Sequence, residues 1–289
     1  MMEDPSGTEV LNIEIDCLLE AVFRIYGYDF RNYSRAHIQR RLLHCMSMSS
    51  LESIPAMMHL ALTDREFFGT ILASLSINVT EMFRDPPFYR ALREEIIPRL
   101  KTWPFVKIWH AGCATGEEVY SMAILLQEEG MADRARIYAT DFNPEALRQA
   151  RDGIYSLEAM RNYTKNYQAA GGNASFADYY NAHYDSAKLC KDVRANIVFS
   201  EHNLVTDGMF GEMNLIFCRN VLIYFDAELQ KRAVGLFHES LCPGGFLCLG
   251  TKESLRFSEL EEAFDQVAEG QKIFRKKLGH PTVSGVLHE

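Results

Sequence analysis

The residues best suited to chemistry lie where an apolar stretch meets a predicted helix. The segment Ile108–Tyr120 reads IWHAGCATGEEVY, in which a turn of small residues leads to Glu117 and Glu118. A strand, a tight turn and a helix in this order open a nucleotide-type α/β sheet. Asp141 ends the next predicted strand, 25 residues after Gly116. A carboxylate in that place can accept hydrogen bonds from the hydroxyls of a ribose.

The composition of the turn distinguishes between two classes of cofactor. A dinucleotide fingerprint requires Gly-x-Gly-x-x-Gly. Positions 112–117 read Gly-Cys-Ala-Thr-Gly-Glu and lack the second and third of those glycines. Glu117 and Glu118 would repel a pyrophosphate at the helix start, but an acid there can pair with the ammonium group of S-adenosylmethionine. The turn therefore favours the methyl donor over a dinucleotide.

A second group of polar residues precedes the turn, in the segment Ser76–Arg90. Thr80 and Arg84 lie four residues apart and are expected to share a helix face. Asn78 is placed just upstream, where it could cap that helix or reach a ligand. An arginine in this context is either a surface charge or part of a site, and the spacing alone does not decide between them.

The elements that position these residues follow from the apolar periodicity. The N-terminal part predicts helices at Ile13–Tyr26, Ser34–Met46, Leu51–Leu62 and Asp64–Ser74, with Ser34 and Ser50 as N-caps. We therefore expect a small all-helical domain with its linker over residues 1–84. From there to residue 278 predicted strands and helices alternate, which indicates an α/β domain built on a parallel sheet. Residues 279–289 are expected to form a tail.

A polar, tyrosine-rich stretch interrupts this alternation at about residues 156–195. It contains Gly171-Gly172 and shows no clear order of helices and strands after Tyr167. Both a small antiparallel subdomain and a mobile loop fit the pattern, and the antiparallel subdomain is favoured.

Length and composition exclude several classes of protein. A chain of 289 residues with 47% hydrophobic and 24% charged residues is typical of a globular protein. The absence of a leader pattern and of a long apolar run favours the cytoplasm, without membrane insertion. The seven cysteines form no CxxC pair and the histidines show no ligand spacing, so we expect neither a disulfide framework nor a metal site. The net charge of −9 argues against nucleic acid as a partner.

One region departs from this acidic balance. Residues 22–45 carry Arg24, Arg31, Arg35, Arg40 and Arg41 against a single acid, Asp29. The excess indicates either a solvated helix face or a docking surface for an acidic partner.

Several motifs in order resemble the CheR family of chemotaxis receptor glutamate methyltransferases. They are YSRAHIQRRL, INVTEMFRD, AGCATGEEVYS, ATDFNPEALRQARDGIY, HNL and FCRNVLIYFD followed by PGG, and they span Tyr33 to Lys276. The resemblance implies a bacterial, Rossmann-like S-adenosylmethionine-dependent methyltransferase sheet, a helical N-terminal domain and a small β-subdomain. Two departures are His110 and Ala114 in the turn, where methyltransferases commonly carry an acid and a glycine. A third is the sequence Gly250–Ser254 after the last motif.

The resemblance also assigns residues to the site. It implies cofactor contacts from Asn78, Thr80, Arg84, Glu118, Asp141, Asn203, Leu204, Cys218 and Arg219, with Arg84 and Tyr224 flanking the transferred methyl group. The arginine-bearing helix would contact a helical receptor, and the insertion would capture a peptide at the receptor's C-terminus in some members of the family.

The expected reaction is methyl transfer from S-adenosylmethionine to receptor glutamates, which releases S-adenosylhomocysteine. A glutamate of ordinary pKa, about 4.3, is ionised at neutral pH, so the reaction needs alignment rather than a general base. Two alternatives are a methyltransferase for another substrate and a non-catalytic adaptor that keeps the fold.

Overall fold

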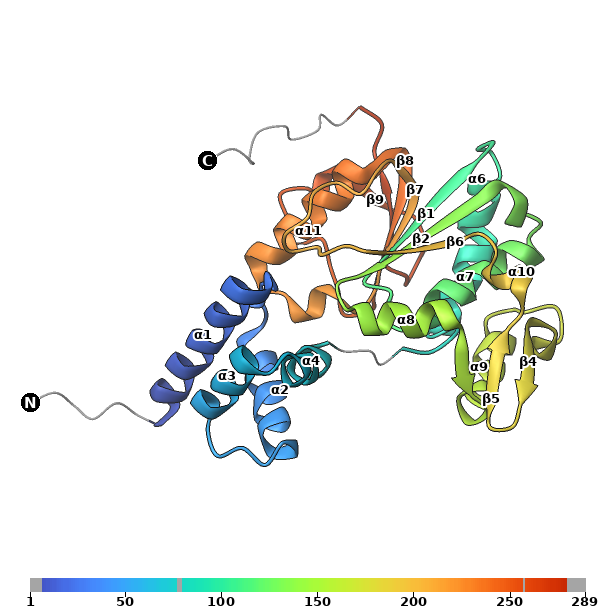
Figure 1. The fold of residues 1–289 in the computed structure, drawn as a ribbon. Coiled ribbons are helices and arrows are strands. Elements are labelled where there is room, and N and C mark those ends of the chain that lie inside the picture. Colours follow the sequence, from blue (N-terminus) through green and yellow to red (C-terminus); the bar gives the residue numbers. More distant parts are fainter. Residues whose placement is uncertain (1–6, 77–79, 257, 280–289) are drawn as a thin grey trace, which may run out of the picture. The chain divides into compact units, whose positions relative to one another are not determined.

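A computed structural model describes residues 7–76, 80–256 and 258–279 of the chain. The chain divides into two compact units, shown in Figure 1. One comprises Met1–Ile77 together with Ile223–Gln230, and the other comprises Asn78–Leu222 together with Lys231–Glu289. Of the tail expected over residues 279–289, all but Gly279 lie outside the described residues.

The first unit is helical, as predicted. It contains α1 (Gly7–Tyr26), α2 (Arg35–Met48), α3 (Ile54–Thr63) and α4 (Arg65–Leu75). Ser34 is the N-cap residue of α2, but the prediction that Ser50 caps α3 is wrong. Ser53 holds that position, and its Oγ accepts a hydrogen bond from the backbone N–H of Ala56 at 3.3 Å. Ser50 instead lies in the turn that ends α2, with φ of 53°.

The core of the helical unit includes a segment from late in the chain. Ile15, Leu18, Leu19 and Val22 recur at helical spacing on α1 and are at most 2% exposed. The backbone N–H of Ser34 donates to the carbonyl of Tyr224 at 2.8 Å. The rings of Tyr33 and Phe225 pack edge to face with centroids 5.0 Å apart. Ile223–Gln230 is thereby part of the helical unit.

The second unit is built on a seven-stranded sheet with the order β6-β2-β1-β7-β8-β10-β9. Its strands are β1 (Val106–Ala111), β2 (Ala135–Asp141), β6 (Ile197–Glu201), β7 (Met213–Cys218), β8 (Leu241–Leu249), β9 (Phe264–Gln266) and β10 (Ile273–Lys276). The pairs from β6 to β8 are parallel, as predicted, whereas β10 runs antiparallel to both β8 and β9. The PGG motif, Pro243–Gly245, lies inside β8, at a register shift opposite Met213 and Leu215.

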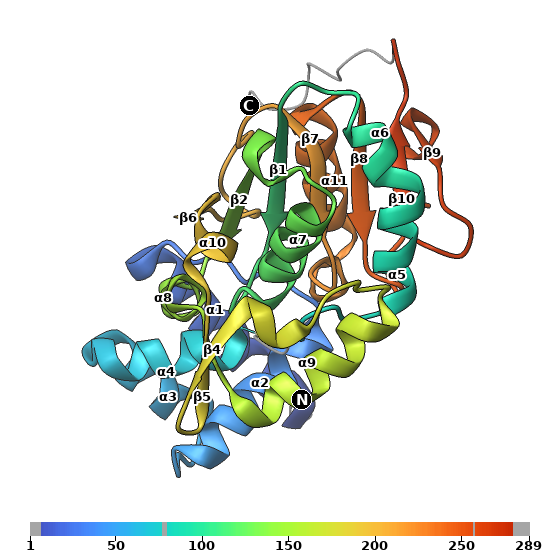
Figure 2. The same ribbon diagram turned by 90° about the vertical axis from the view of Figure 1, so that its right-hand side faces the viewer.

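Helices flank this sheet. They are α5 (Pro86–Ala91), α6 (Ile97–Leu100), α7 (Glu117–Glu128), α8 (Pro144–Asp152), α10 (Lys191–Arg194) and α11 (Ala227–Ser240), with α7 in front of β1 in Figure 2. The short helices η1 to η5 are Leu92–Ile96, Ala132–Arg134, Phe176–Tyr179, Leu222–Tyr224 and Glu261–Ala263. All residues of β1 except Lys107 are buried, as in a parallel strand covered on both faces. Asn143 and Gly153 are the N-cap and C-cap residues of α8.

The interruption of the sheet is an antiparallel subdomain, as favoured by the sequence. It consists of β3 (Ile154–Ser156), α9 (Leu157–Ala169), β4 (Tyr180–His183) and β5 (Ser186–Leu189), and its sheet has the order β3-β5-β4. Glu128, at the end of α7, anchors it by accepting hydrogen bonds from the hydroxyls of Tyr167 and Tyr179.

The residues just before Pro86 correct another prediction. Thr80–Asp85 are not helical, so Thr80 and Arg84 do not share a helix face. Phe83 and Asp85 have φ of 53° and 62°, values that end any helix that would pass through them. Among the described residues, no helix is long and apolar enough to span a membrane.

Candidate functional site

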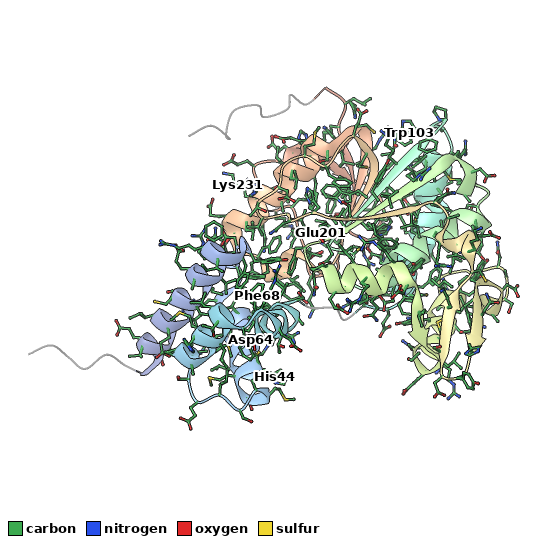
Figure 3. The ribbon with its side chains drawn as sticks, in the orientation of Figure 1. His44, Asp64, Phe68, Trp103, Glu201 and Lys231 are labelled. Atoms are coloured by element: carbon green, nitrogen blue, oxygen red, sulfur yellow. The ribbon has the colours of Figure 1, made fainter. Side chains whose placement is uncertain are left out.

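Four neighbouring parallel strands bring polar residues to one edge of the sheet. β1, β2, β6 and β7 end at Ala111, Asp141, Glu201 and Cys218. In Figure 3, Trp103 marks the side from which β1 starts and Glu201 marks the carboxyl end of β6. Because ligands of open α/β sheets bind outside the carboxyl ends of the strands, this edge is the expected position of the site.

The turn after β1 is tight and is pinned to the neighbouring strand. Gly112 has φ of 77°, and a Cβ there would lie 2.7 Å from Cγ2 of Val221, so no larger residue fits. Ala114 takes a left-handed φ of 48°, at the position where related turns carry a glycine. Its backbone N–H donates to Oδ2 of Asp141 at 2.9 Å. The second strand thus helps to hold the turn in a conformation that alanine rarely adopts.

Asp141 is buried and already hydrogen-bonded. Its Oδ1 accepts from the backbone N–H of Asn143 at 2.9 Å. Burial raises the pKa of Asp141, and the backbone N–H groups of Asn143 and Ala114 offset only part of that increase. Each carboxylate oxygen has a second lone pair, so the side chain can still accept a hydrogen bond from a hydroxyl.

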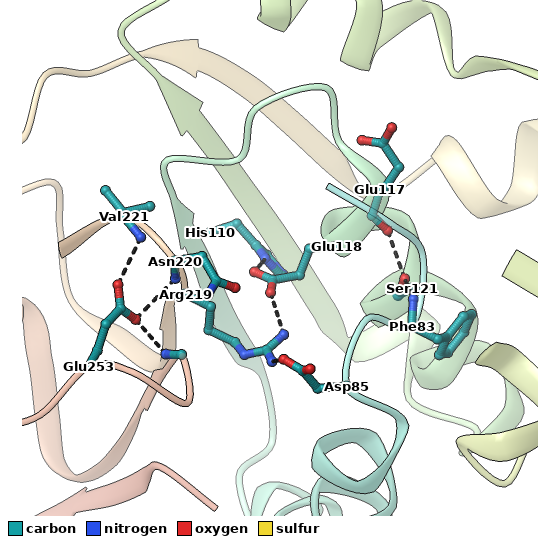
Figure 4. Close-up of polar contacts among 11 residues, drawn as sticks. Phe83, Asp85, His110, Glu117, Glu118, Ser121, Arg219, Asn220, Val221 and Glu253 are labelled. Atoms are coloured by element: carbon teal, nitrogen blue, oxygen red, sulfur yellow. Dashed lines mark hydrogen bonds and ion pairs between the residues drawn. The ribbon is translucent and has the colours of Figure 1, made fainter. Parts of the chain in front are cut away.

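An ion-pair network occupies the start of α7. Arg219, directly after β7, donates from Nη1 to Oε2 of Glu118 at 2.9 Å and from Nη2 to Oδ2 of Asp85 at 2.6 Å (Figure 4). The Arg219 side chain is only 1% exposed, and its guanidinium carbon lies 4.0 Å from the ring centroid of Phe88. A buried guanidinium between two carboxylates and an aromatic face is held in one orientation.

His110 completes this network from β1. Its Nδ1 lies 3.2 Å from Oε1 of Glu118, and its ring stacks on Phe217 with centroids 4.3 Å apart. Burial on its own would raise the pKa of Glu118, but the hydrogen bond with His110 and the charge of Arg219 lower it below its usual value. Glu118 is therefore an ionised carboxylate at neutral pH.

The network fits the amino-acid end of S-adenosylmethionine. The Glu118 side chain is 18% exposed, so its charge remains accessible to a ligand. Nε of Arg219 and Nε2 of His110 are buried, with no hydrogen-bond partner among the described residues. A carboxylate beside a guanidinium complements an ammonium group next to a carboxylate, which is what the methionine part of this cofactor carries.

Comparison with known proteins identifies the family. The model of the "CheR methyltransferase, SAM binding domain" matches residues 78–273, and that of the "CheR methyltransferase, all-alpha domain" matches residues 13–76. The chain belongs to the CheR methyltransferase family. Its cofactor is S-adenosylmethionine, and the predicted methyltransferase fold is confirmed.

Relatives of this CheR protein occur in several bacteria. Cher3 of Pseudomonas putida, whose methyltransferase name is provisional, is 52% identical over 92% of this chain and 97% of its own length. Chemotaxis protein methyltransferase 2 of Vibrio cholerae is 31% identical, with 89% of this chain and 90% of its own covered. The chemotaxis protein methyltransferase of Listeria monocytogenes is 29% identical, with 81% and 87% covered.

The other predicted site residues of this CheR protein are placed as follows. Thr80 and Arg84 are half-buried, and Asn78 lies outside the described residues. Asn203 and Leu204 follow β6, where Oδ1 of Asn203 accepts from the backbone N–H of Val205 at 3.0 Å. Leu204 is largely buried.

Cys218 and Tyr224 have different surroundings. Cys218 is fully buried, which raises the pKa of its thiol well above the usual value and leaves it a packing residue. Tyr224 belongs to the helical unit, where its ring centroid lies 4.6 Å from that of His37. Of the predicted site residues, Glu118 and Arg219 meet in the ion-pair network at the start of α7, and Asp141 holds the adjacent turn.

Sequence reasoning missed three residues that shape this site. Asp85 and His110 are partners of Arg219 and Glu118, and His110 had been noted only as a departure from the usual acid. Glu253 is the third, and it lies in the divergent sequence after β8. Its carboxylate accepts hydrogen bonds from the backbone N–H groups of Asn220, Val221, Leu222 and Gly250 at 2.5–3.0 Å. Figure 4 shows the bonds from Asn220 and Val221. Glu253 thus fixes the loop that follows Arg219.

Proposed function

We propose that this CheR protein transfers a methyl group from S-adenosylmethionine to glutamate side chains of a chemoreceptor-like protein in the cytoplasm. The products would be glutamate methyl esters and S-adenosylhomocysteine. The observation that carries the proposal is the ionised Glu118, which His110 and Arg219 hold at the carboxyl end of β1. The chemotaxis names of the relatives support the choice of substrate.

We assign the cofactor roles to the residues predicted from the sequence. Glu118 binds the ammonium group, Arg219 orients Glu118 and faces the cofactor carboxylate, and Asp141 accepts from the ribose hydroxyls. Asn203 and Leu204 lie beside the adenine. Asn78, Thr80 and Cys218 complete the lining.

The transfer step needs alignment of two opposite charges. When bound, S-adenosylmethionine supplies an electrophilic methyl group on a sulfonium. Arg84 holds the acceptor carboxylate in line with that methyl group, and Tyr224 orients the acceptor. Because a glutamate is ionised at neutral pH, no residue has to remove a proton.

Receptor docking is assigned to α2. Three of the arginines predicted to dock the receptor have acidic partners in the helical unit: Arg24 pairs with Glu20, Arg31 with Glu20 and Asp29, and Arg35 with Asp16. α2 itself carries Arg40 and Arg41 and no acid over its 14 residues. We therefore centre the docking surface on Arg40 and Arg41, which suit acidic receptor helices.

A receptor-tail peptide at the insertion remains part of the proposal. β4 (Tyr180–His183) pairs only with β5 among the described strands, so it is the edge strand of the small sheet. An extended peptide can add to such an edge through main-chain hydrogen bonds. The proposed division into a helical part, residues 1–84, and a methyltransferase part, residues 85–278, differs from the two compact units at residues 78–84 and Ile223–Gln230.

Methyl transfer from labelled S-adenosylmethionine to purified receptor fragments tests this function. We expect label that is released by mild base, because carboxyl methyl esters are base-labile. Calorimetric titration with S-adenosylhomocysteine separates the alternatives. Absence of binding would favour an adaptor, whereas binding with base-stable label would point to a different acceptor group.

A further inference from the structure

The segment that carries Arg84 is conformationally strained. Phe83 and Asp85, which flank Arg84, have φ of 53° and 62°. Left-handed backbone costs a non-glycine residue about 1–2 kcal/mol, and such residues persist only where their surroundings hold them. The position of Arg84 is therefore set by whatever holds its two neighbours.

A hydrogen bond to α7 restrains Phe83. The backbone N–H of Phe83 donates to Oγ of Ser121 at 2.8 Å, and Ser121 in turn donates to the carbonyl of Glu117 at 2.7 Å (Figure 4). Ser121 is fully buried. Its hydroxyl thus ties Phe83 to the same first turn of α7 that carries Glu118.

Hydrogen bonds from the insertion restrain Glu81 and Met82. Nδ2 of Asn166, on α9, donates to the carbonyl of Met82 and to Oε2 of Glu81, both at 3.1 Å. Nδ2 of Asn162, one turn earlier, donates to the same Oε2 at 3.0 Å. A helix of the insertion therefore holds the two residues that precede Phe83.

We propose that Ser121 and Asn166 are positioning residues that hold the segment Glu81–Asp85 so that Arg84 is presented for methyl transfer. Neither residue belongs to the predicted cofactor or acceptor contacts. The inference rests on the proposed function for the role of Arg84, but the positioning itself is a property of the chain alone. It gives α9 a part in the transfer step that is separate from any peptide bound at the insertion.

The hydrogen-exchange rate of the Phe83 amide measures how firmly this segment is held, and it requires no substrate. Ser121→Ala removes the acceptor of that amide, and Asn166→Asp replaces the donor to Met82 and Glu81 by a carboxylate. We expect Phe83 to exchange about tenfold faster or more in both variants. Gln168→Ala is the matched control, because it removes an exposed amide from the same helix. Unchanged protection of Phe83 in both variants would overturn the proposal.

Kinetics tests the consequence for methyl transfer. We expect kcat to fall about 10- to 100-fold in both variants, as for other small displacements of aligning groups. The Kd for S-adenosylhomocysteine should stay within about twofold of the wild type. The double variant Glu81→Gln with Asn166→Asp should recover part of the lost kcat, because the glutamine amide can donate to the new carboxylate. A merely structural role would not lower kcat while leaving the Kd for S-adenosylhomocysteine unchanged.

Failure of the two ideas can be told apart. If Arg84→Ala lowers kcat and the Ser121 and Asn166 variants do not, the positioning proposal is wrong and the proposed function stands. If the wild type yields no base-labile label while Phe83 loses protection in both variants, the proposed function is wrong and the hold on the segment stands.

Discussion

Arg219 Nη1 lies 2.9 Å from Oε2 of Glu118, which joins the end of β7 to the first turn of α7. The two residues are 101 positions apart in the chain. This pair fixes the direction of the Glu118 carboxylate before any ligand arrives, and preorganisation of this kind limits the entropic cost of binding.

Replacement of Glu118 tests the proposed ammonium site. Glu118→Gln keeps the shape of the side chain but removes its charge, so the cofactor loses a charge-assisted hydrogen bond worth about 1.5–3 kcal/mol. We expect the Kd for S-adenosylhomocysteine, measured by calorimetry, to rise roughly 10- to 100-fold. Glu145→Gln on α8 is a suitable control, since Glu145 forms an exposed surface pair with Arg148. Equal affinity of the two variants would remove Glu118 from the cofactor site.

Arg84 is expected to act on transfer more than on binding. Arg84→Ala removes the group proposed to align the acceptor carboxylate, so kcat should fall by about 100-fold or more. The affinity for S-adenosylhomocysteine should change by much less. Single-turnover transfer and calorimetry on the same preparation measure the two effects. A loss of affinity that accounts for the whole loss of rate would show that Arg84 is a cofactor ligand only.

Glu117 should make the stability of the protein depend on pH. Burial raises the pKa of Glu117 to about 7, although hydrogen bonds from Thr115 and Tyr163 oppose the increase. A raised pKa means that the folded state favours the protonated acid. The contribution of Glu117 to the free energy of unfolding is therefore complete below the unfolded pKa of about 4.3. It is lost as the pH rises through about 7.

Glu117→Gln removes this titration but can keep both hydrogen bonds. We expect the variant to be more stable than the wild type at pH 8, by at most about 4 kcal/mol, and the two to converge near pH 4. Urea unfolding of both proteins at several pH values measures the difference. A difference that does not change between pH 4 and 8 would show that Glu117 has the same protonation in the folded and unfolded states.

The docking surface can be tested by charge reversal on α2. Arg40 is exposed, and its Nη2 lies 3.3 Å from Nδ1 of His37. Burial and the charges of Arg41 and Arg40 lower the pKa of His37 to about 4, so its ring is neutral. Arg40→Glu should raise the KM for an acidic receptor roughly three- to tenfold and weaken its salt dependence.

Arg24→Glu is the matched control for this surface. Arg24 already pairs with Glu20 on its own helix, so its reversal should have the smaller effect on the receptor KM. An Arg24 effect as large as that of Arg40 would move the docking surface toward α1.

Local patterns predicted much of this fold and part of its site. The helical unit follows from apolar spacing, and the positions of Glu118 and Asp141 follow from the rule that sites form where parallel strands end. The pairing of Arg219 with Asp85 could not be predicted, because the two residues are 134 positions apart and no local pattern links them. The left-handed conformation of Phe83 could not be predicted either, because phenylalanine normally avoids it and only tertiary contacts hold the residue there. Aspartate adopts this conformation more readily, but nothing in the local sequence marked Asp85 for it.

The inclusion of Ile223–Gln230 in the helical unit bears on how the chain is synthesised. Domains generally fold as units, with the N-terminal one first during translation. Here the backbone N–H of Ser34 and the ring of Tyr33 find their partners in Tyr224 and Phe225, which leave the ribosome only after most of the sheet has been made. The first unit to emerge is thus among the last to be completed. A nascent chain that stalls before residue 223 would contain the four helices without the segment that Tyr33 and Ser34 contact.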